Sequence, residues 1–190
     1  PTEIDKQVYE LSKNTEDLET QFTVNPEFPN EQNIYFGNIK YVVEHIVDLK
    51  SMDRKLKQFP DVDFSSPNTR RQYLDFEITM YRDTLDDPDF NVQALDDFAR
   101  NYETKLNELG YEVVERADPT VNPKLQELYD EYNDEIESLA GQQLRTMEAD
   151  VLESTQPLTA KALREGYSHT DLDSALLYNK STNTFTTAKN

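Results

Sequence analysis

Cysteine is missing from this sequence, and glycine is scarce, with 4 residues among 190. The lack of cysteine excludes disulfide bonds, thiolate metal sites and cysteine nucleophiles. The shortage of glycine disfavours tight turns, and the glycine-rich phosphate-binding patterns GxxxxGKS/T and GxGxxG do not occur. The GxSxG pattern that surrounds many nucleophilic serines is also absent. We therefore expect a non-enzymatic protein with no catalytic residue, bound metal or cofactor.

Long hydrophobic runs are missing as well. No stretch approaches the run of about 18 apolar residues that a membrane helix needs. No apolar block follows a basic one near the start, as it would in a signal peptide. A first residue Pro1 is consistent with removal of an initiator methionine before proline, as in a cytoplasmic chain. We expect a cytoplasmic protein, or a virion component if the chain is viral, without membrane contact.

Acidic and aromatic residues are abundant instead. The formal net charge is -19, and the chain contains 9 phenylalanines and 11 tyrosines. Disordered chains are poor in the aromatic residues that form cores, so we expect a folded protein with one domain or two small ones. Because a surface of this charge repels DNA and RNA, we expect no direct nucleic-acid binding.

The charge is distributed unevenly along the chain. Most of the negative charge lies between residues 73 and 156. A basic cluster precedes it, consisting of Lys50, Arg54, Lys55, Lys57, Arg70 and Arg71. The acidic residues fit a solvated helix exterior; alternatively, the acidic middle of one copy faces the basic cluster of another copy or of a partner. The basic cluster, together with Tyr178 and Phe185, forms the predicted partner-binding set.

Apolar residues recur at helical spacing over most of the chain. The pattern predicts helices at 3–22, 30–59, 67–85, 95–109 and 123–154. The helices over 30–59 and 123–154 would each be about 45 Å long. The predicted buried stripe of the second long helix comprises Leu125, Leu128, Tyr132, Ile136, Leu139, Met147 and Val151.

Shorter elements are predicted towards the C-terminus. Residues 111–115 (YEVVE) alternate and form a candidate strand, which needs a partner in this chain or in a neighbour's sheet. Short helices are predicted from Pro157 to Gly166 and over 170–178. The predicted fold is mainly all-α: an elongated antiparallel helical bundle with two long helices at 1–154, a short helical hairpin at 155–179, and an extended Thr- and Asn-rich tail at 180–190.

The two histidines are candidates for metal binding. His45 shares a helix face with Asp48, and His169 precedes Asp171 and Asp173 in the sequence HTDLD. A histidine and a carboxylate can bind a metal, but one such pair is at best half of a site. We interpret the first pair as a helix-face ion pair or hydrogen bond, and residues 170–173 as a helix start.

Two acidic pairs have the spacing ExxE and ExxD: Glu112 and Glu115, followed by Glu131 and Asp134. This spacing resembles the magnesium-binding motifs of helical nucleotide pyrophosphatases. The resemblance implies magnesium-dependent nucleotide hydrolysis at these four carboxylates. The first pair departs from the family's pattern, because residues three apart on a strand point to opposite faces.

Three functions are therefore open. The leading hypothesis is a structural or assembly protein that binds other protein subunits, either copies of itself or different chains. Long amphipathic helices, segregated charge and tyrosine-rich faces favour it, and small helical proteins without cysteine or tryptophan are typical of bacteriophage virion connector and neck components. The alternatives are an acidic inhibitor that mimics DNA, with carboxylates such as Asp86, Asp87, Asp89, Asp96 and Asp97, and the pyrophosphatase, which we favour least.

Overall fold

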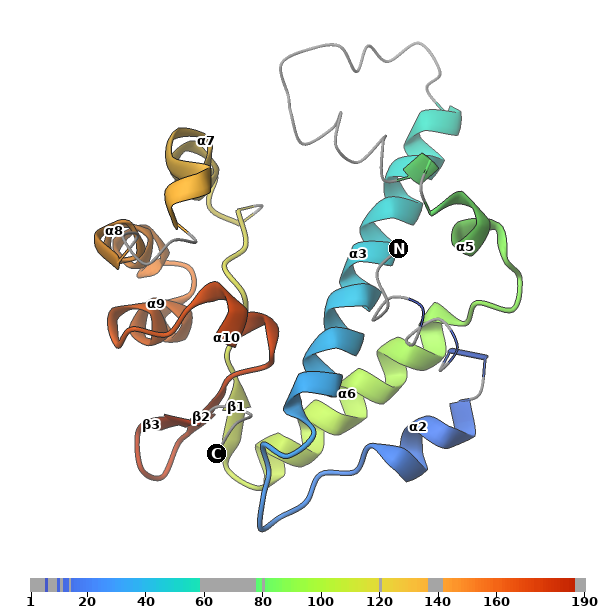
Figure 1. Cartoon of the computed structure of the whole chain (residues 1–190), viewed down its shortest axis with the longest axis horizontal. Helices are drawn as coiled ribbons and strands as arrows, with labels where there is room; N and C mark the ends of the chain where they lie inside the picture. Colours follow the sequence, from blue (N-terminus) through green and yellow to red (C-terminus); the bar gives the residue numbers. More distant parts are fainter. Residues whose placement is uncertain are drawn as a thin grey trace. The chain divides into compact units, whose positions relative to one another are not determined.

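Helices dominate the computed structural model of the protein, which describes residues 6, 10, 12, 13, 15–58, 78, 79, 81–119, 121–136 and 142–186 (Figure 1). These residues form eight helices and one three-stranded antiparallel sheet. The predicted mainly helical class is confirmed. The arrangement as an elongated antiparallel bundle stays a prediction, and the expected helix start at Ser66 and Pro67 lies outside the described residues.

The chain divides into two compact units, each built from two separate stretches. Unit 1 comprises Pro1–Thr23 and Asn38–Tyr102, and unit 2 comprises Val24–Gly37 and Glu103–Asn190. The residues after 154 belong to the same unit as residues 103–154. Each unit is described by itself below.

Unit 1 contains α2 (Thr15–Gln21), α5 (Arg82–Asp86) and most of α3 (Asn33–Gln58) and α6 (Val92–Glu108). Both long helices bury apolar residues three or four positions apart, as predicted for an amphipathic helix. The buried residues of α3 in this unit are Ile39, Val42, Val43, Ile46 and Leu49, and those of α6 are Leu95, Phe98, Ala99 and Tyr102. The predicted helix over 30–59 is confirmed, with its start at Asn33.

An ion pair connects two elements of unit 1. Arg82 in α5 contacts the Asp53 carboxylate in α3 at 2.9 Å, and Lys57, one turn further along α3, contacts the same carboxylate at 3.1 Å. Burial raises the pKa of Asp53, but the hydrogen bonds and positive charges of Lys57 and Arg82 lower it by more, so the pKa lies below its ordinary value. The pair therefore favours the ionised carboxylate and holds α5 against α3.

Unit 2 contains two helices where a single long helix was predicted. The prediction of one helix over 123–154 is wrong, because α7 (Pro123–Ile136) and α8 (Gln142–Leu152) are separate and pack against each other. Tyr132 inside α7 also has non-helical backbone angles. The start was predicted correctly: α7 begins at Pro123, and the side chain of Asn122 accepts a hydrogen bond from the Lys124 amide at 3.2 Å.

The predicted strand is confirmed and pairs within the chain. Strand β1 (Tyr111–Val113) lies antiparallel to β2 (Leu177–Asn179), which in turn pairs with β3 (Thr184–Thr186). Gly110 ends the preceding helix α6 in the left-handed conformation (φ 93°), which costs glycine no steric penalty. This turn directs the chain from α6 into the sheet.

The C-terminal segment differs from the prediction. The helix expected over 170–178 is α10 (His169–Asp173), which ends earlier because Ala175 has a positive φ of 56° and residues 177–179 join the sheet. Ser168 begins α10 through a capping box with Asp171. Residues 184–186 of the expected tail form an edge strand, and Phe185 is buried.

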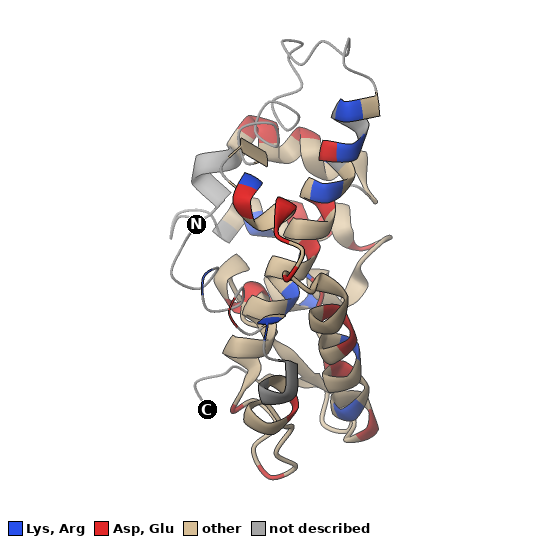
Figure 2. Cartoon of the chain, turned by 90° about the vertical axis from the view of Figure 1, so that its right-hand side faces the viewer, with Lys and Arg blue, Asp and Glu red and all other residues tan. Residues whose placement is uncertain are grey.

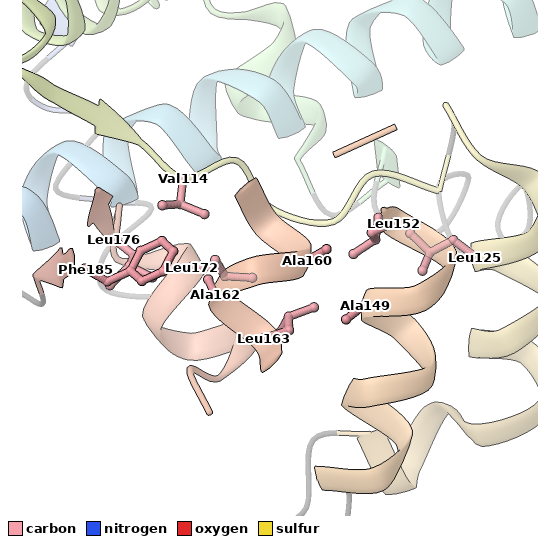
Figure 3. Packing of buried hydrophobic residues seen from close by; sticks show 10 residues of the cluster. All are labelled: Val114, Leu125, Ala149, Leu152, Ala160, Ala162, Leu163, Leu172, Leu176 and Phe185. Atoms are coloured by element: carbon pink, nitrogen blue, oxygen red, sulfur yellow. The ribbon is translucent and has the colours of Figure 1, made fainter. Parts of the chain in front are cut away.

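The hydrophobic core of unit 2 lies between α7, α8, α9 (Pro157–Arg164), α10 and the sheet (Figure 3). Its buried members are Val114, Leu125, Ala149, Leu152, Ala160, Ala162, Leu163, Leu172, Leu176 and Phe185. Three small alanines let α8 and α9 pack closely, and these two helices are in contact. The core thus joins segments that are far apart in the sequence.

Candidate functional site

A buried polar cluster lies in unit 2 and joins three helices. Glu148 in α8 is fully buried (0% exposed). The Tyr129 hydroxyl in α7 donates a hydrogen bond to its Oε1 at 2.5 Å, and Nε2 of His169 in α10 lies 2.8 Å from its Oε2. The Tyr129 and His169 rings also meet edge to face, with centroids 6.3 Å apart. We name these three residues the Glu148 cluster.

Local sequence places each member of the Glu148 cluster. Asn122 fixes the start of α7 and donates a hydrogen bond through Nδ2 to the Val151 carbonyl of α8 at 2.9 Å. The capping box of Ser168 and Asp171 fixes the first turn of α10, where His169 is the first helical residue. The starts of α7 and α10, and the contact of Asn122 with α8, therefore bring Tyr129 and His169 to the Glu148 carboxylate.

The electrostatics of the Glu148 cluster favour a structural role. A buried carboxylate is stable only when donors or a positive charge replace its water. The Tyr129 hydroxyl and the His169 ring supply two such contacts. Because the His169 side chain is 20% exposed, this ring connects the buried carboxylate to the surface.

The sequence did not reveal Glu148, because the helical phase of α8 was predicted wrongly. The predicted stripe placed Met147 and Val151 in the core; Val151 is partly buried and packs against the core, but Met147 is 44% exposed. The inward face instead includes Glu148, Ala149 and Leu152, which are all buried. A signal was present: Ala149 and Leu152 are an apolar pair three residues apart, and Glu148 lies four residues before Leu152.

The carboxylates near His169 in the sequence are used elsewhere. The Asp171 carboxylate accepts hydrogen bonds from the Ser168 amide and hydroxyl, and Asp173 pairs with Arg116 at 3.8 Å. His45 in unit 1 stacks on Tyr41, with centroids 6.0 Å apart, and meets Tyr81 edge to face. In the part of the chain that the structure describes, no group of three or more His, Asp or Glu side chains could hold a metal ion.

The residues of the ExxE and ExxD pairs lie on different kinds of element. Glu112 is exposed on β1, opposite Tyr178 in the register, and Glu115 follows the strand. Glu131 is exposed on α7. The side chain of Asp134 lies outside the described residues. The helical arrangement that the family's motif requires is therefore not found for the first pair.

The predicted basic cluster is described only in part. The side chain of Lys55 and both Arg70 and Arg71 lie outside the described residues. Arg54 is exposed and Lys50 is half-buried on α3, and Lys57 pairs with Asp53. Figure 2 shows acidic residues (red) on many of the described elements, with fewer basic ones (blue) between them.

The two predicted aromatic partner residues contact each other inside unit 2. The ring centroids of Tyr178 and Phe185 are 5.2 Å apart, and Nζ of Lys161 lies 4.9 Å from the first and 5.7 Å from the second. The Tyr178 hydroxyl contacts the Asn183 side chain. Because Phe185 is 9% exposed and belongs to the core, its ring serves the chain's own hairpin.

Large apolar side chains are exposed in a segment that the sequence did not single out. Phe28 is 58% exposed, Tyr35 is 50% exposed and Ile34 is 47% exposed. All three belong to the stretch Val24–Gly37 of unit 2. We name residues 28–35 the apolar segment. It overlaps the first turn of α3, in which Asn33 and the following Phe36 are fully buried.

None of the helices in the described part of the chain combines the length and apolar composition that crossing a membrane requires. Comparison with family models, curated proteins and solved structures yields no match to this chain.

Proposed function

We propose that this protein is a non-enzymatic assembly protein that acts through protein–protein contacts in a larger complex. The observation that supports it is the exposure of Phe28, Ile34 and Tyr35 within eight residues of one another. Single exposed apolar residues are normal on protein surfaces. Three large ones in one short segment provide the apolar and aromatic contacts that the centre of a protein interface contains.

The polar features of unit 2 also support a structural protein. The carboxylate of Glu148, which has the deepest burial of the described acidic groups, binds two side chains of neighbouring helices. The rings of Tyr178 and Phe185 contact each other, and Nζ of Lys161 lies over the Tyr178 ring. These contacts give a folded scaffold whose exposed apolar segment is available to other subunits.

Size-exclusion chromatography with light scattering, at low and at high salt, tests this proposal. We expect the full chain to form a complex larger than a monomer that persists at high salt, because apolar contacts are not screened. Replacing Phe28→Ser and Tyr35→Ser together should shift it towards the monomer. The control is Glu27→Ser, at an exposed residue next to Phe28. A wild-type monomer at both salt concentrations would contradict assembly of this chain through the apolar segment.

We extend the proposal to the class of complex. Virion connector and neck components of bacteriophages are the class that the composition resembles. Subunits of such complexes bind copies of themselves or neighbouring subunits, which fits an exposed apolar segment on a folded unit. Electron microscopy of the purified chain tests this extension, because a connector-type subunit should form closed rings.

An acidic inhibitor that mimics DNA is the second candidate function. Glu127, Asp130 and Glu131 are all exposed on α7, so a row of carboxylates faces solvent there. Other carboxylates of the acidic region are already bound: Asp87 pairs with Lys13 at 3.6 Å, and Asp96 pairs with Arg100 at 3.0 Å. Competition with DNA for a panel of DNA-binding enzymes, weakening steeply with salt, would favour this function; no competition would contradict it.

A further inference from the structure

The outer edge of strand β3 is a surface at which a further strand can pair with the sheet. The sheet has the order β1-β2-β3, so β3 lies at one edge of it. Edge strands present backbone N–H and C=O groups that can pair with another strand. Pairing at this edge depends on which backbone groups of β3 point away from β2 and on which strand can bind them.

The register of the sheet determines which backbone groups of β3 point away from β2. The Val114 amide donates to the Leu176 carbonyl at 2.8 Å, and the Lys180 amide donates to the Gly110 carbonyl at 3.1 Å. Since hydrogen-bonded pairs alternate along an antiparallel ladder, the backbone groups of Tyr178 also face β1.

Leu177 and Asn179 therefore direct their backbone groups to β3, where their partners are Thr186 and Thr184. The residue between these two partners, Phe185, consequently directs its N–H and C=O away from β2. In the described part of the sheet, one donor and one acceptor of the same residue thus form the centre of the β3 edge.

The β3 edge has only one of the features that usually prevent strand pairing, its short length of three residues. Natural edge strands are also protected by charged residues, proline or bulges, and β3 contains no charged residue or proline. Strand β3 reads Thr-Phe-Thr, with two β-branched residues and no charge, whereas the other edge strand, β1, carries the exposed Glu112. The residues around β3 also differ from the rest of the chain, because residues 180–190 contain two lysines and no acidic residue. In a protein with a net charge of -19, the absence of acidic residues from this segment reduces the repulsion between two copies that meet there.

We propose that a second copy of this chain pairs its β3 with β3 of the first, antiparallel about a two-fold axis at Phe185. In this register Phe185 faces Phe185, and the two residues exchange both backbone hydrogen bonds without any offset. Thr184 of each copy faces Thr186 of the other, a favourable cross-strand pair. Two three-stranded sheets become one six-stranded sheet with a self-complementary contact. The inference rests on the proposed function, since it names one partner and one surface for the assembly protein.

The contact is short, so we expect weak association, with a Kd on the order of 0.1–1 mM for the β3 contact alone. High salt should strengthen it, because it screens the repulsion between two acidic copies. Association through the basic cluster would instead weaken with salt. The direction of the salt effect therefore separates these two ways of pairing.

Amide hydrogen exchange of the full chain, measured by NMR over a series of protein concentrations, tests the register. The amides of Thr184 and Thr186 should be protected at every concentration, because they face β2. The Phe185 amide should exchange faster than these two amides when dilute and slow down as pairing proceeds, about twofold at a chain concentration equal to the Kd, where half of the chains are paired. Exchange at Phe185 that does not change with concentration overturns the proposal.

A pair of matched variants gives a second test. Thr184→Lys places a charge on the exposed face of β3, and the lysines of two paired copies lie diagonally about 7–8 Å apart. We expect it to weaken self-association about tenfold and to abolish the protection of Phe185. Ser181→Lys adds the same charge at an exposed turn residue outside the strand and should change neither. The Thr186 amide remains protected if the hairpin is intact. Equal effects of the two variants contradict pairing at β3.

These tests can fail independently of the proposed function. If Phe28→Ser and Tyr35→Ser disperse a larger complex while the Phe185 amide never gains protection, the assembly function stands and the β3 contact is overturned. If Phe185 is protected with concentration but the variants of the apolar segment have no effect, the β3 contact stands and the apolar segment is not the assembly surface.

Discussion

At the scale of single residues, Glu148 shows how one buried carboxylate organises three helices. Its two oxygens contact Tyr129 and His169. Neither contact is visible in the sequence, because Tyr129 lies 19 positions before Glu148 and His169 lies 21 positions after it. Burying an ionised group costs free energy unless neighbouring groups compensate it. The compensation here comes from α7 and α10, so these helices are held to α8 through polar side chains as well as through the apolar core.

We expect Glu148→Ala to lower the free energy of unfolding by about 2–3 kcal/mol, because it leaves a cavity and removes the partner of two polar groups. Chemical denaturation followed by circular dichroism measures this loss. The control is Glu131→Ala on the exposed face of α7, which should change stability by less than about 0.5 kcal/mol. Equal effects of the two substitutions would show that the Glu148 cluster does not stabilise the fold.

Gly37 is the second residue whose role depends on tertiary contact. A Cβ at this position would lie 2.5 Å from the Asp173 carbonyl oxygen and 2.9 Å from the Ala175 amide nitrogen. Both atoms belong to the backbone and cannot rotate away. The side chain of Asn33, one turn earlier in α3, donates to the Ala175 carbonyl at 3.1 Å. The first turn of α3 therefore packs directly on the turn between α10 and β2.

We expect Gly37→Ala to lower the free energy of unfolding by about 1–3 kcal/mol, although alanine favours a helix more than glycine does. The clash with the backbone outweighs the gain in helix propensity, which is about 1 kcal/mol. The matched control is Ser51→Ala at an exposed position of the same helix, which should be neutral or slightly stabilising. Stabilisation by Gly37→Ala would contradict the close packing.

At the scale of elements, the contact of α5 with α3 depends on pH. The pKa of Asp53 lies below its ordinary value, because Lys57 and Arg82 more than offset the opposing effect of burial. The ionised carboxylate therefore stabilises the fold above the ordinary Asp pKa, and this contribution is lost as the pH falls through the lowered value.

We expect Asp53→Asn to reduce stability by about 1 kcal/mol near neutral pH, and the difference from the wild type to shrink as the solution is acidified below the ordinary Asp pKa. Denaturation curves at a series of pH values measure it. Asp89→Asn, at an exposed residue, serves as the control. A difference that stays constant down to the most acidic sample would show that the ion pair does not contribute.

The hairpin of β2 and β3 is the element whose structure differs most from the prediction made from the sequence. Residues 180–190 were predicted as a polar tail, so their deletion would leave the fold intact. Phe185 instead belongs to the core of unit 2 and contacts the Tyr167 and Tyr178 rings, at 5.3 Å and 5.2 Å between centroids.

We expect Phe185→Ala to lower the free energy of unfolding by about 3 kcal/mol. Urea denaturation measures the loss, and Ser181→Ala at an exposed turn position provides the control. If the hairpin were a dispensable tail, the two variants would have the same stability as the wild type.

At the scale of the whole molecule, the net charge of -19 is the dominant property. Like charges repel within the folded chain, and salt screens this repulsion. We expect the midpoint of thermal unfolding to rise by several degrees between about 0.05 and 0.5 M sodium chloride. Scanning calorimetry measures the shift. A midpoint that falls with salt would mean that ion pairs such as Arg82 with Asp53 outweigh the general repulsion.

Much of the local structure could be predicted from the sequence, for particular reasons. Asn122 before Pro123 marks the start of α7, and Gly110 marks the end of α6, because these residue types suit helix ends whatever surrounds them. The alternation in Tyr111–Val113 marked β1 in the same way. The helical spacing of apolar residues indicated a mainly helical protein, and the lack of cysteine excluded disulfide bonds.

Contacts between distant segments could not be predicted, because they depend on which helix faces pack together. The packing of α7 on α8 divides the predicted long helix and changes the helical phase, so that Glu148 is buried and Met147 is exposed. The pairing of β1 with β2 places Leu177 and Tyr178, predicted as helical, in a strand, since backbone hydrogen bonds to a strand more than 60 residues away outweigh local propensity. The helix ends at Asn122 and Gly110, the net charge and the mainly helical class follow from local sequence and composition. The partner of each strand, the burial of Phe185 and the Glu148 cluster follow from folding, because burial and pairing are properties of residues that come together from distant positions.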